Sequence, residues 1–321
     1  MEPYRTCFNS ALEKFREMGY KTVLGPNVYA DKGMGKSNTA EACGAEINDF
    51  FINDRCDAII SCGGGETMCE DLLYVDFERI AQSKPKWYLG YSDNTNLTFT
   101  LPMLCDTAAI YGPCASSFGM NRWHEAVQDA MNVLTGKELN IHSYDRWELE
   151  DDENAGPLDG YNLTEENCIK VYRGSKSSQE EHFSGRMIGG CMDCLVMHCG
   201  TRYDKVHEFL KRYEDDGIIW FMEACELDPM GVWRTLWQME NAGWFEGKIK
   251  GFIFGRPMKY TADFCGLLYP EAIMRVIEKY DVPVILDADL GHLPPMMPVI
   301  SGAVGEVSAE DGKLTIRQEL R

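Results

Sequence analysis

The sequence predicts an α/β fold built on a parallel β-sheet that has helices on both faces. Short apolar runs of strand-forming residues alternate with segments of helical periodicity, most regularly in residues 1–136. This alternation is typical of parallel strands joined by helices. Ligands of such sheets bind beyond the carboxyl ends of the strands. The functional site is therefore expected where the strands end.

Apolar spacing and turn residues place the elements of the first part of the chain. They predict a helix at 8–18 ending at Gly19, a strand at 21–24, a helix at 40–51 capped by Ser37 or Asn38, a strand at 58–60, helices at 68–74 and 77–82, a strand at 87–90 and a helix at 123–134. The polar, turn-rich segment 137–183 then marks a domain junction. We expect an N-terminal nucleophile domain at 1–136, a linker or substrate loop at 137–183, and a C-terminal domain at 184–321.

The second half repeats the alternation and ends in a hairpin. Its expected elements are helices at 191–199 and around 206–210, a strand at 217–222, a helix at 228–243, a strand at 250–254, a helix at 269–280, a strand at 282–286 and a hairpin at 302–316. Asp228 as N-cap and Pro229 at the first helical position give the third helix a clear start. Asp311-Gly312 is the expected hairpin turn.

Composition excludes several classes of partner. The formal charge of −20 over 321 residues argues against binding nucleic acid or an anionic membrane. No apolar run reaches the roughly 20 residues that span a bilayer, and no signal-peptide core is evident. The 13 cysteines are scattered through apolar segments, as expected of a reduced, cytoplasmic protein. Cys191 and Cys194 form a C-x-x-C pair, which we interpret as helix packing in preference to a metal or redox site.

Ser92 is the candidate nucleophile because it follows the strand ending at Gly90 and precedes a polar segment able to start a helix. Such a turn lifts a serine out of the sheet, towards free backbone amides. Asn94 replaces the last glycine of Gly-x-Ser-x-Gly, and asparagine tolerates left-handed φ. The alternative interpretation is a simple helix cap. The Gly63–Gly65 turn matches no nucleotide-binding motif, so it is either a tight turn or a second oxyanion donor.

His292 and Glu223 are the candidate partners of this serine. His292 follows a buried strand and Gly291, and two prolines hold its loop, whereas the other five histidines lie in helices or in the polar junction. Glu223 ends a buried strand, where a carboxylate needs a partner to offset its desolvation. Glu226 and Asp228 are rivals, but a loop position and a helix cap explain them better.

Four segments resemble, in the same order, the LD-carboxypeptidase family of serine peptidases, which includes the muramoyltetrapeptide carboxypeptidases and the microcin C immunity peptidases. They are the Gly63-Gly64 turn with Gly90-Tyr-Ser-Asp-Asn-Thr95, Gly185-x-x-x-Gly189-Gly190 with Gly200-Thr-Arg-Tyr203, Phe221-Met-Glu223, and Gly291-His292 followed by Pro298 and Gly302-Ala303. The resemblance spans about residues 55–305. Members of the family normally begin with an apolar strand, whereas this chain opens on Met1-Glu-Pro-Tyr-Arg5.

The resemblance implies a Rossmann-like N-terminal domain with a smaller β-rich C-terminal domain, usually as a homodimer. It implies a metal-free triad without cofactor: Ser92 as nucleophile, Glu223 as orienting acid and His292 as base. The amides of Asp93 and Gly64 would form the oxyanion hole, and Gly63 and Trp147 are the expected substrate contacts.

Two substrates fit this chemistry, and two further functions stay open. The first substrate is the L,D-amide bond of muropeptides in peptidoglycan recycling. The second is the amide of a peptidyl- or aminoacyl-nucleotide antibiotic, whose adenine would stack on Trp147, Tyr161 and Tyr172. The other two hypotheses are a non-catalytic binding protein and a nucleotide-dependent enzyme. Only the alternating architecture supports the nucleotide-dependent enzyme.

Overall fold

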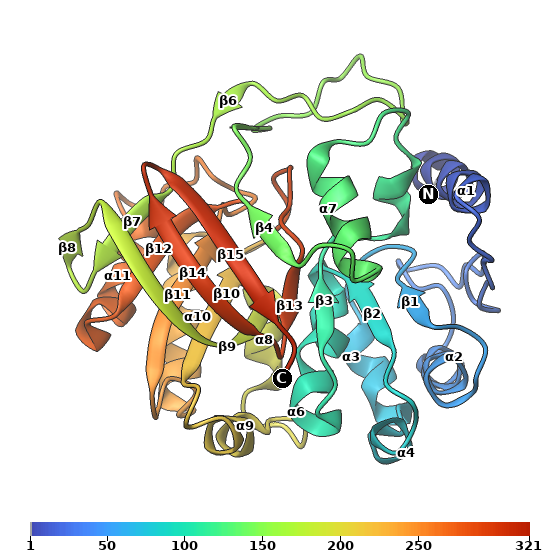
Figure 1. The fold of residues 1–321 in the computed structure, drawn as a ribbon, viewed down its shortest axis with the longest axis horizontal. Coiled ribbons are helices and arrows are strands. Elements are labelled where there is room, and N and C mark those ends of the chain that lie inside the picture. Colours follow the sequence, from blue (N-terminus) through green and yellow to red (C-terminus); the bar gives the residue numbers. More distant parts are fainter. Residues whose placement is uncertain (1) are drawn as a thin grey trace.

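The computed structural model describes residues 2–321, which form two main β-sheets with helices packed on them. Figure 1 shows the N-terminal part, in blue and cyan, beside the β-rich C-terminal part, in yellow to red. The first sheet consists of β1 (Ala58–Ile60), β2 (Trp87–Gly90), β3 (Ala109–Tyr111) and β13 (Val299–Ser301). The first three strands are parallel, and β13 lies antiparallel to β3. The predicted parallel sheet is therefore present, and a strand from near the end of the chain completes it.

Helices surround this sheet, as the alternation predicts. They are α1 (Glu2–Glu17), α2 (Ala40–Ile52), α3 (Met68–Asp71), η1 (Leu72–Tyr74), α4 (Phe77–Ala81), η2 (Ser92–Asn94), α5 (Thr95–Thr98), α6 (Thr100–Cys105), η3 (Ala115–Gly119) and α7 (Glu125–Leu134). The helix α1 packs its Phe8, Ala11 and Phe15 face inward. A Cβ atom at Gly119 would lie 2.0 Å from the Cys7 carbonyl oxygen, so glycine allows η3 to approach α1 closely.

Two local predictions are wrong. Lys21–Leu24 is irregular and pairs with no strand, and Leu24 is 41% exposed. Short apolar runs form strands only where a neighbouring strand and a core receive them. The N-cap of α2 is Thr39, whose hydroxyl accepts the Ala42 amide at 3.3 Å. Asn38 instead accepts the Thr39 amide.

The second sheet has nine strands in the order β4-β15-β14-β9-β10-β11-β12-β7-β8. They are β4 (Asn140–His142), β15 (Lys313–Glu319), β14 (Val304–Glu310), β9 (Glu180–Cys191), β10 (Ile218–Glu223), β11 (Ile249–Gly255), β12 (Pro283–Ala288), β7 (Lys170–Arg173) and β8 (Lys176–Ser177). The four central strands are parallel, and the flanking strands are antiparallel. Segment 137–183 thus supplies β4, β7, β8 and the first residues of β9 to this sheet, and also the pair β5 (Arg146–Trp147) and β6 (Glu165–Glu166).

Both faces of the central strands are buried, which explains their continuous apolar sequences. One face, with Trp220 and Phe252, packs against a helical layer. That layer is α8 (Met192–His198), α9 (Val206–Arg212), α10 (Pro229–Asn241), α11 (Tyr269–Ile277) and η4 (Glu278–Tyr280). The other face, with Phe221 and Ile285, shares one core with Ile110 of β3. The β14–β15 hairpin turns at Asp311-Gly312 as predicted, with φ of 51° and 74°.

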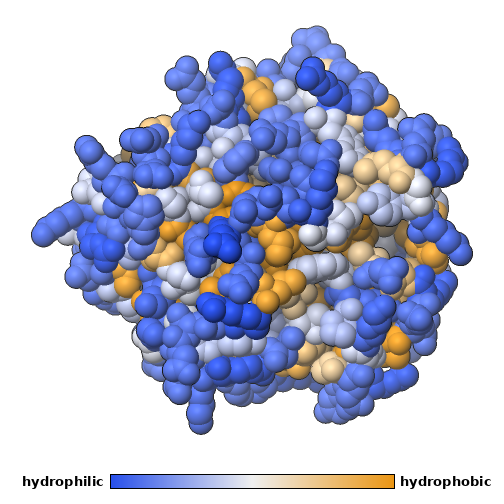
Figure 2. All heavy atoms as spheres, in the orientation of Figure 1, coloured by the Kyte–Doolittle hydropathy of each residue, from blue (hydrophilic) through white to orange (hydrophobic). Residues whose placement is uncertain are grey.

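The surface is largely polar. Blue, hydrophilic residues cover most of the face in Figure 2, and apolar residues gather near its centre. None of the helices in residues 2–321 has the length and apolar character that crossing a membrane requires.

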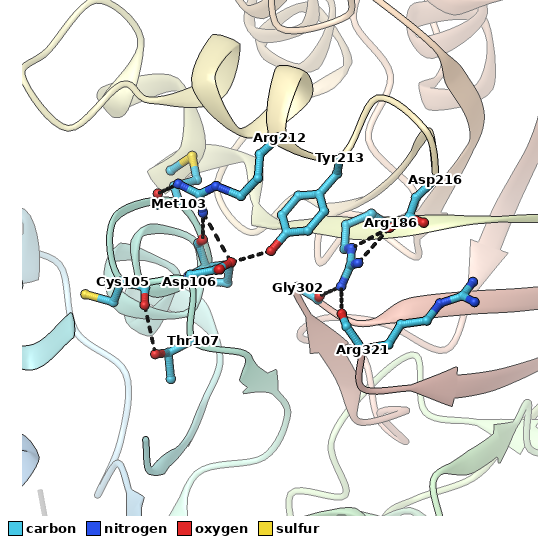
Figure 3. Close-up of polar contacts among 11 residues, drawn as sticks. Met103, Cys105, Asp106, Thr107, Arg186, Arg212, Tyr213, Asp216, Gly302 and Arg321 are labelled. Atoms are coloured by element: carbon cyan, nitrogen blue, oxygen red, sulfur yellow. Dashed lines mark hydrogen bonds and ion pairs between the residues drawn. The ribbon is translucent and has the colours of Figure 1, made fainter. Parts of the chain in front are cut away.

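Polar contacts join the two parts of the molecule at the end of α9 (Figure 3). Arg212 donates to the Asp106 carboxylate at 3.2 Å and to the Pro102 carbonyl at 3.3 Å, and Tyr213 also donates to Asp106. The buried Arg186 lies 3.9 Å from the Tyr213 ring and donates to the Gly302 carbonyl at 2.8 Å. These contacts fasten α6 to the second sheet.

A buried ion pair joins β11 to the loop after β12. Arg256 is 1% exposed and pairs with the fully buried Asp289. Asp289 also accepts the Tyr144 amide at 2.8 Å and the Asn167 side chain at 2.7 Å. Segment 137–183 is thereby attached to the loop that carries His292.

Replacing Arg256→Met should lower the free energy of unfolding by about 3–5 kcal/mol, because Asp289 would stay buried without its cation. Urea denaturation followed by tryptophan fluorescence measures this loss. Lys313→Met is the matched control, since the Lys313–Asp145 pair is exposed and should contribute about 0–1 kcal/mol. Equal losses in the two variants would contradict the assignment.

Candidate active site

The turn after β2 holds Ser92 in a left-handed conformation with φ of 63°. This conformation is uncommon outside glycine and is typical of a nucleophile turn between strand and helix. A Cβ atom at Gly90 would lie 2.7 Å from the Asn94 side chain, so only glycine fits there. Asn94 itself has an ordinary helical φ of −63°. Its left-handed tolerance is therefore not what the turn uses, contrary to the sequence-based argument.

The Asn94 side chain serves another purpose, because it fastens the turn. Its amide group donates to the Gly63 carbonyl at 3.0 Å and to the Tyr91 carbonyl at 2.8 Å. The Ser92 turn and the glycine turn after β1 are thus held together by a side chain that the usual glycine could not provide.

Ser92, His292 and Glu223 form a continuous chain of hydrogen-bonding contacts. His292 Nε2 lies 2.9 Å from Ser92 Oγ, and His292 Nδ1 lies 3.0 Å from Glu223 Oε2. The Glu223 side chain is 1% exposed and the His292 side chain is 12% exposed. The Glu223 carboxylate is therefore shielded from solvent, whereas Ser92 and His292 stay partly accessible.

The buried carboxylate keeps its charge. Burial alone would raise the pKa of Glu223, but the His292 charge and hydrogen bonds from His292, Tyr111 and Cys191 outweigh it and lower this pKa. For His292, burial acts to lower the pKa, whereas the Glu223 carboxylate and the nearby Cys225 raise it above the ordinary 6.5. The two groups form a coupled acid–base pair.

The residues expected to form the oxyanion hole lie beside Ser92. A Cβ atom at Gly64 would lie 3.3 Å from Ser92 Oγ, so the Gly64 backbone is adjacent to the hydroxyl. The Asp93 carboxylate accepts the Met68 amide at 2.9 Å and the Asn96 side chain at 2.9 Å. Asp93 therefore holds the end of the glycine turn against the nucleophile turn.

Comparison with known proteins identifies the family of the chain. The LD-carboxypeptidase N-terminal domain matches residues 2–112, and the LD-carboxypeptidase C-terminal domain matches residues 184–307. The chain belongs to the LD-carboxypeptidase family. It is thus a serine-type peptidase, a hydrolase of peptide or amide bonds.

The similarity of this LD-carboxypeptidase family member to related proteins extends over nearly its whole chain. A protein of Treponema pallidum (strain Nichols), named "Putative carboxypeptidase", is 21% identical over 314 residues, 96% of this chain and 86% of that protein. An MccF-like protein from Streptococcus pneumoniae in complex with AMP has a TM-score of 0.77 at 21% identity, covering 98% of this chain and 94% of that one. The microcin C7 self immunity protein MccF in complex with aspartyl sulfamoyl adenosine has a TM-score of 0.80 at 22% identity, covering 98% and 91%. The structural likeness establishes a shared fold.

Trp147 packs against two residues outside the trio. It is 6% exposed, with the Arg256 guanidinium 4.8 Å above its ring and the Tyr260 ring 5.0 Å away. Tyr161 instead packs on His124, and Tyr172 packs in the helix-covered core. The three aromatic residues proposed to stack an adenine therefore lie in separate surroundings.

Two aromatic residues at the site were not singled out from the sequence. Tyr111 donates to Glu223 Oε1 at 2.6 Å, and the Tyr91 ring lies 5.1 Å from the His292 ring. Tyr111 ends β3, a three-residue strand that the sequence analysis did not assign. The sequence signal that could have revealed this strand is the apolar run directly before Gly112. The strand ends at the same edge of the sheet as β2, which leads to Ser92.

Gly291 is a precise test of the contact between Glu223 and His292. Its φ is 98°, and a Cβ atom there would lie 2.6 Å from Glu223 Oε2. Gly291→Ala should displace the carboxylate and slow phosphonylation of Ser92 by a fluorophosphonate probe at least about tenfold, the kinetic equivalent of 1.4 kcal/mol.

The control for this variant is Gly136→Ala, which has a similar positive φ of 68° but no atom within 4 Å of the new Cβ. Both variants should lose about 1–2 kcal/mol of stability from left-handed strain. Only the Gly291 variant should label slowly, and equal labelling rates would refute the steric argument.

Proposed function

We propose that this protein is an LD-carboxypeptidase, which hydrolyses the amide bond between an L-centre and a terminal D-amino acid in muropeptides. The single observation that carries the proposal is the contact chain from Ser92 Oγ through His292 to Glu223, with steps of 2.9 and 3.0 Å. Nucleophile, base and orienting acid in this order recur on unrelated folds. Membership of the family and the relative named as a carboxypeptidase support the substrate class.

The proposed mechanism assigns one role to each member of the trio. Ser92 Oγ attacks the scissile carbonyl while His292 Nε2 accepts its proton, and His292 then gives this proton to the leaving amine. Water next attacks the acyl-enzyme, again with His292 as base, and releases the shortened peptide. Glu223 holds the imidazole through Nδ1 and stabilises its positive charge.

The proposed oxyanion hole consists of the backbone amides of Asp93 and Gly64. Donors fixed beside the nucleophile stabilise the negative oxygen of the tetrahedral intermediate without reorganising during the reaction. The Asp93 and Asn94 side chains, which hold the glycine turn in place, provide that rigidity. Gly63 and Trp147 remain proposed substrate contacts.

A second candidate function is that of a microcin C immunity-type peptidase, in which the trio of this chain would cleave the amide of a peptidyl- or aminoacyl-nucleotide. Its support is the likeness to MccF proteins whose structures contain AMP or aspartyl sulfamoyl adenosine. Parallel assays separate the candidates: release of D-alanine from a muramoyl tetrapeptide, and release of the amino acid from an aminoacyl sulfamoyl adenosine. The substrate with the higher kcat/KM identifies the function.

Ser92→Ala should reduce hydrolysis of the preferred substrate by about 10⁴-fold or more, because the nucleophile is lost. Thr107→Ala, which removes a half-buried hydroxyl that donates to the Cys105 carbonyl, should keep full activity. Steady-state D-alanine release measures both variants. Hydrolysis that persists in Ser92→Ala would remove Ser92 from the mechanism.

The pH dependence should show an acidic limb above pH 6.5. His292 must be neutral to accept the serine proton, and the Glu223 charge raises the pKa of His292 above its ordinary 6.5. The kcat/KM value should therefore rise with pH through this raised pKa. Glu223→Gln removes the charge, so the limb should move to lower pH while activity falls. A wild-type limb below pH 6.5 would contradict the coupling.

A further inference from the structure

Tyr111 joins the two sheets at the candidate active site. Its side chain is completely buried at the end of β3. The hydroxyl donates to Glu223 Oε1 at 2.6 Å and accepts the Ser92 amide at 3.3 Å. Ser92 lies on the turn after β2 and Tyr111 ends β3, both strands of the first sheet, whereas Glu223 ends β10 of the second. One hydroxyl thus contacts both the nucleophile turn and the orienting acid.

Packing alone does not explain this hydroxyl. The Tyr111 ring contacts Phe221 at 5.8 Å and Tyr91 at 6.5 Å between ring centroids. Phenylalanine would make the same contacts without burying a polar group, which is costly unless it is hydrogen-bonded. Burial, and then the Glu223 charge, raise the pKa of the Tyr111 phenol, so it stays protonated and donates.

We propose that Tyr111 is a positioning residue that aligns the Glu223 carboxylate with the Ser92 turn. It also reduces the electrostatic attraction between this carboxylate and the proton of His292. The inference rests on the proposed function, because it gives Tyr111 a part in the same reaction. It also applies to either candidate substrate, since the Tyr111 hydroxyl contacts Glu223 and the Ser92 amide, which both reactions would use.

The two oxygens of the Glu223 carboxylate accept hydrogen bonds from different residues. Glu223 Oε1 receives the Tyr111 hydroxyl, and Oε2 receives His292 Nδ1. A donor on one oxygen withdraws negative charge from the other. Without the Tyr111 hydroxyl, Oε2 should bind the imidazolium more strongly, so the pKa of His292 should rise. The titratable groups that face the Glu223–His292 pair are Tyr91, Tyr111, Cys191 and Cys225.

The test compares Tyr111→Phe with Tyr144→Phe. Tyr144 is also buried, and its hydroxyl also donates to a carboxylate, Asp129, at 2.9 Å. It is therefore matched for loss of a buried hydroxyl–carboxylate bond. Tyr111→Phe should lower kcat about 10- to 100-fold, the range expected for a hydrogen bond to a charged group. The KM value should stay within about twofold, because Tyr111 does not touch substrate.

The pH behaviour distinguishes positioning from general stabilisation. In Tyr111→Phe, the acidic limb of kcat/KM and the NMR titration of the His292 imidazole should both move to higher pH. The His292 resonance is assigned by its loss in His292→Asn. Tyr144→Phe should move neither. A loss of kcat in Tyr111→Phe with an unmoved His292 titration would overturn the proposal.

The NMR titration also separates this inference from the proposed function. If the wild-type protein hydrolyses neither substrate, the proposed function fails, and the His292 titration still decides the role of Tyr111. If Tyr111→Phe does not fold, the full chain with 3-fluorotyrosine placed at position 111 alone, by suppression of a stop codon, gives the opposite test. Its more acidic phenol is a stronger donor, so the His292 titration should move to lower pH. An unmoved titration there would overturn the proposal.

Discussion

The buried negative charge of Glu223 is the constraint on which the rest of the site depends. A carboxylate that is 1% exposed persists only where charged or hydrogen-bonding partners replace water. Its partners are Tyr111 from the first sheet and His292 from the loop after β12. The end of β3 in the first sheet must therefore lie against the end of β10 in the second. The shared core and the contacts at the end of α9 keep them there.

Close approach of backbone segments is the second constraint, and glycines make it possible. Gly291 leaves room for the Glu223 carboxylate, and Gly64 allows the turn after β1 to reach the Ser92 hydroxyl. Ser92 itself has a strained backbone, with φ of 63°. Asn94 compensates by fastening the turn to Gly63. A departure from the usual glycine elbow therefore preserves the geometry by another route.

The sequence predicted those features whose signals are local. Ser92 and His292 each follow an apolar strand and a glycine, and Glu223 ends an apolar strand. The Asp311-Gly312 turn and the Asp228 cap were likewise readable, because each depends on a few neighbouring residues. Lys21–Leu24 was misread as a strand because nothing in a short apolar run says whether another strand lies beside it. The strand ending at Tyr111 was missed for the same reason.

The sequence by itself determined the family, the alternating fold class and the three candidate residues of the trio, since these follow from residue type and order. The tertiary structure alone decided which groups touch: Ser92 meets His292 across 200 positions, and Tyr111 meets Glu223 across 112. It also decided that Trp147 is covered by Arg256 and Tyr260. Such contacts arise from how two sheets pack on one core, and no local pattern encodes the packing of segments so far apart in the chain.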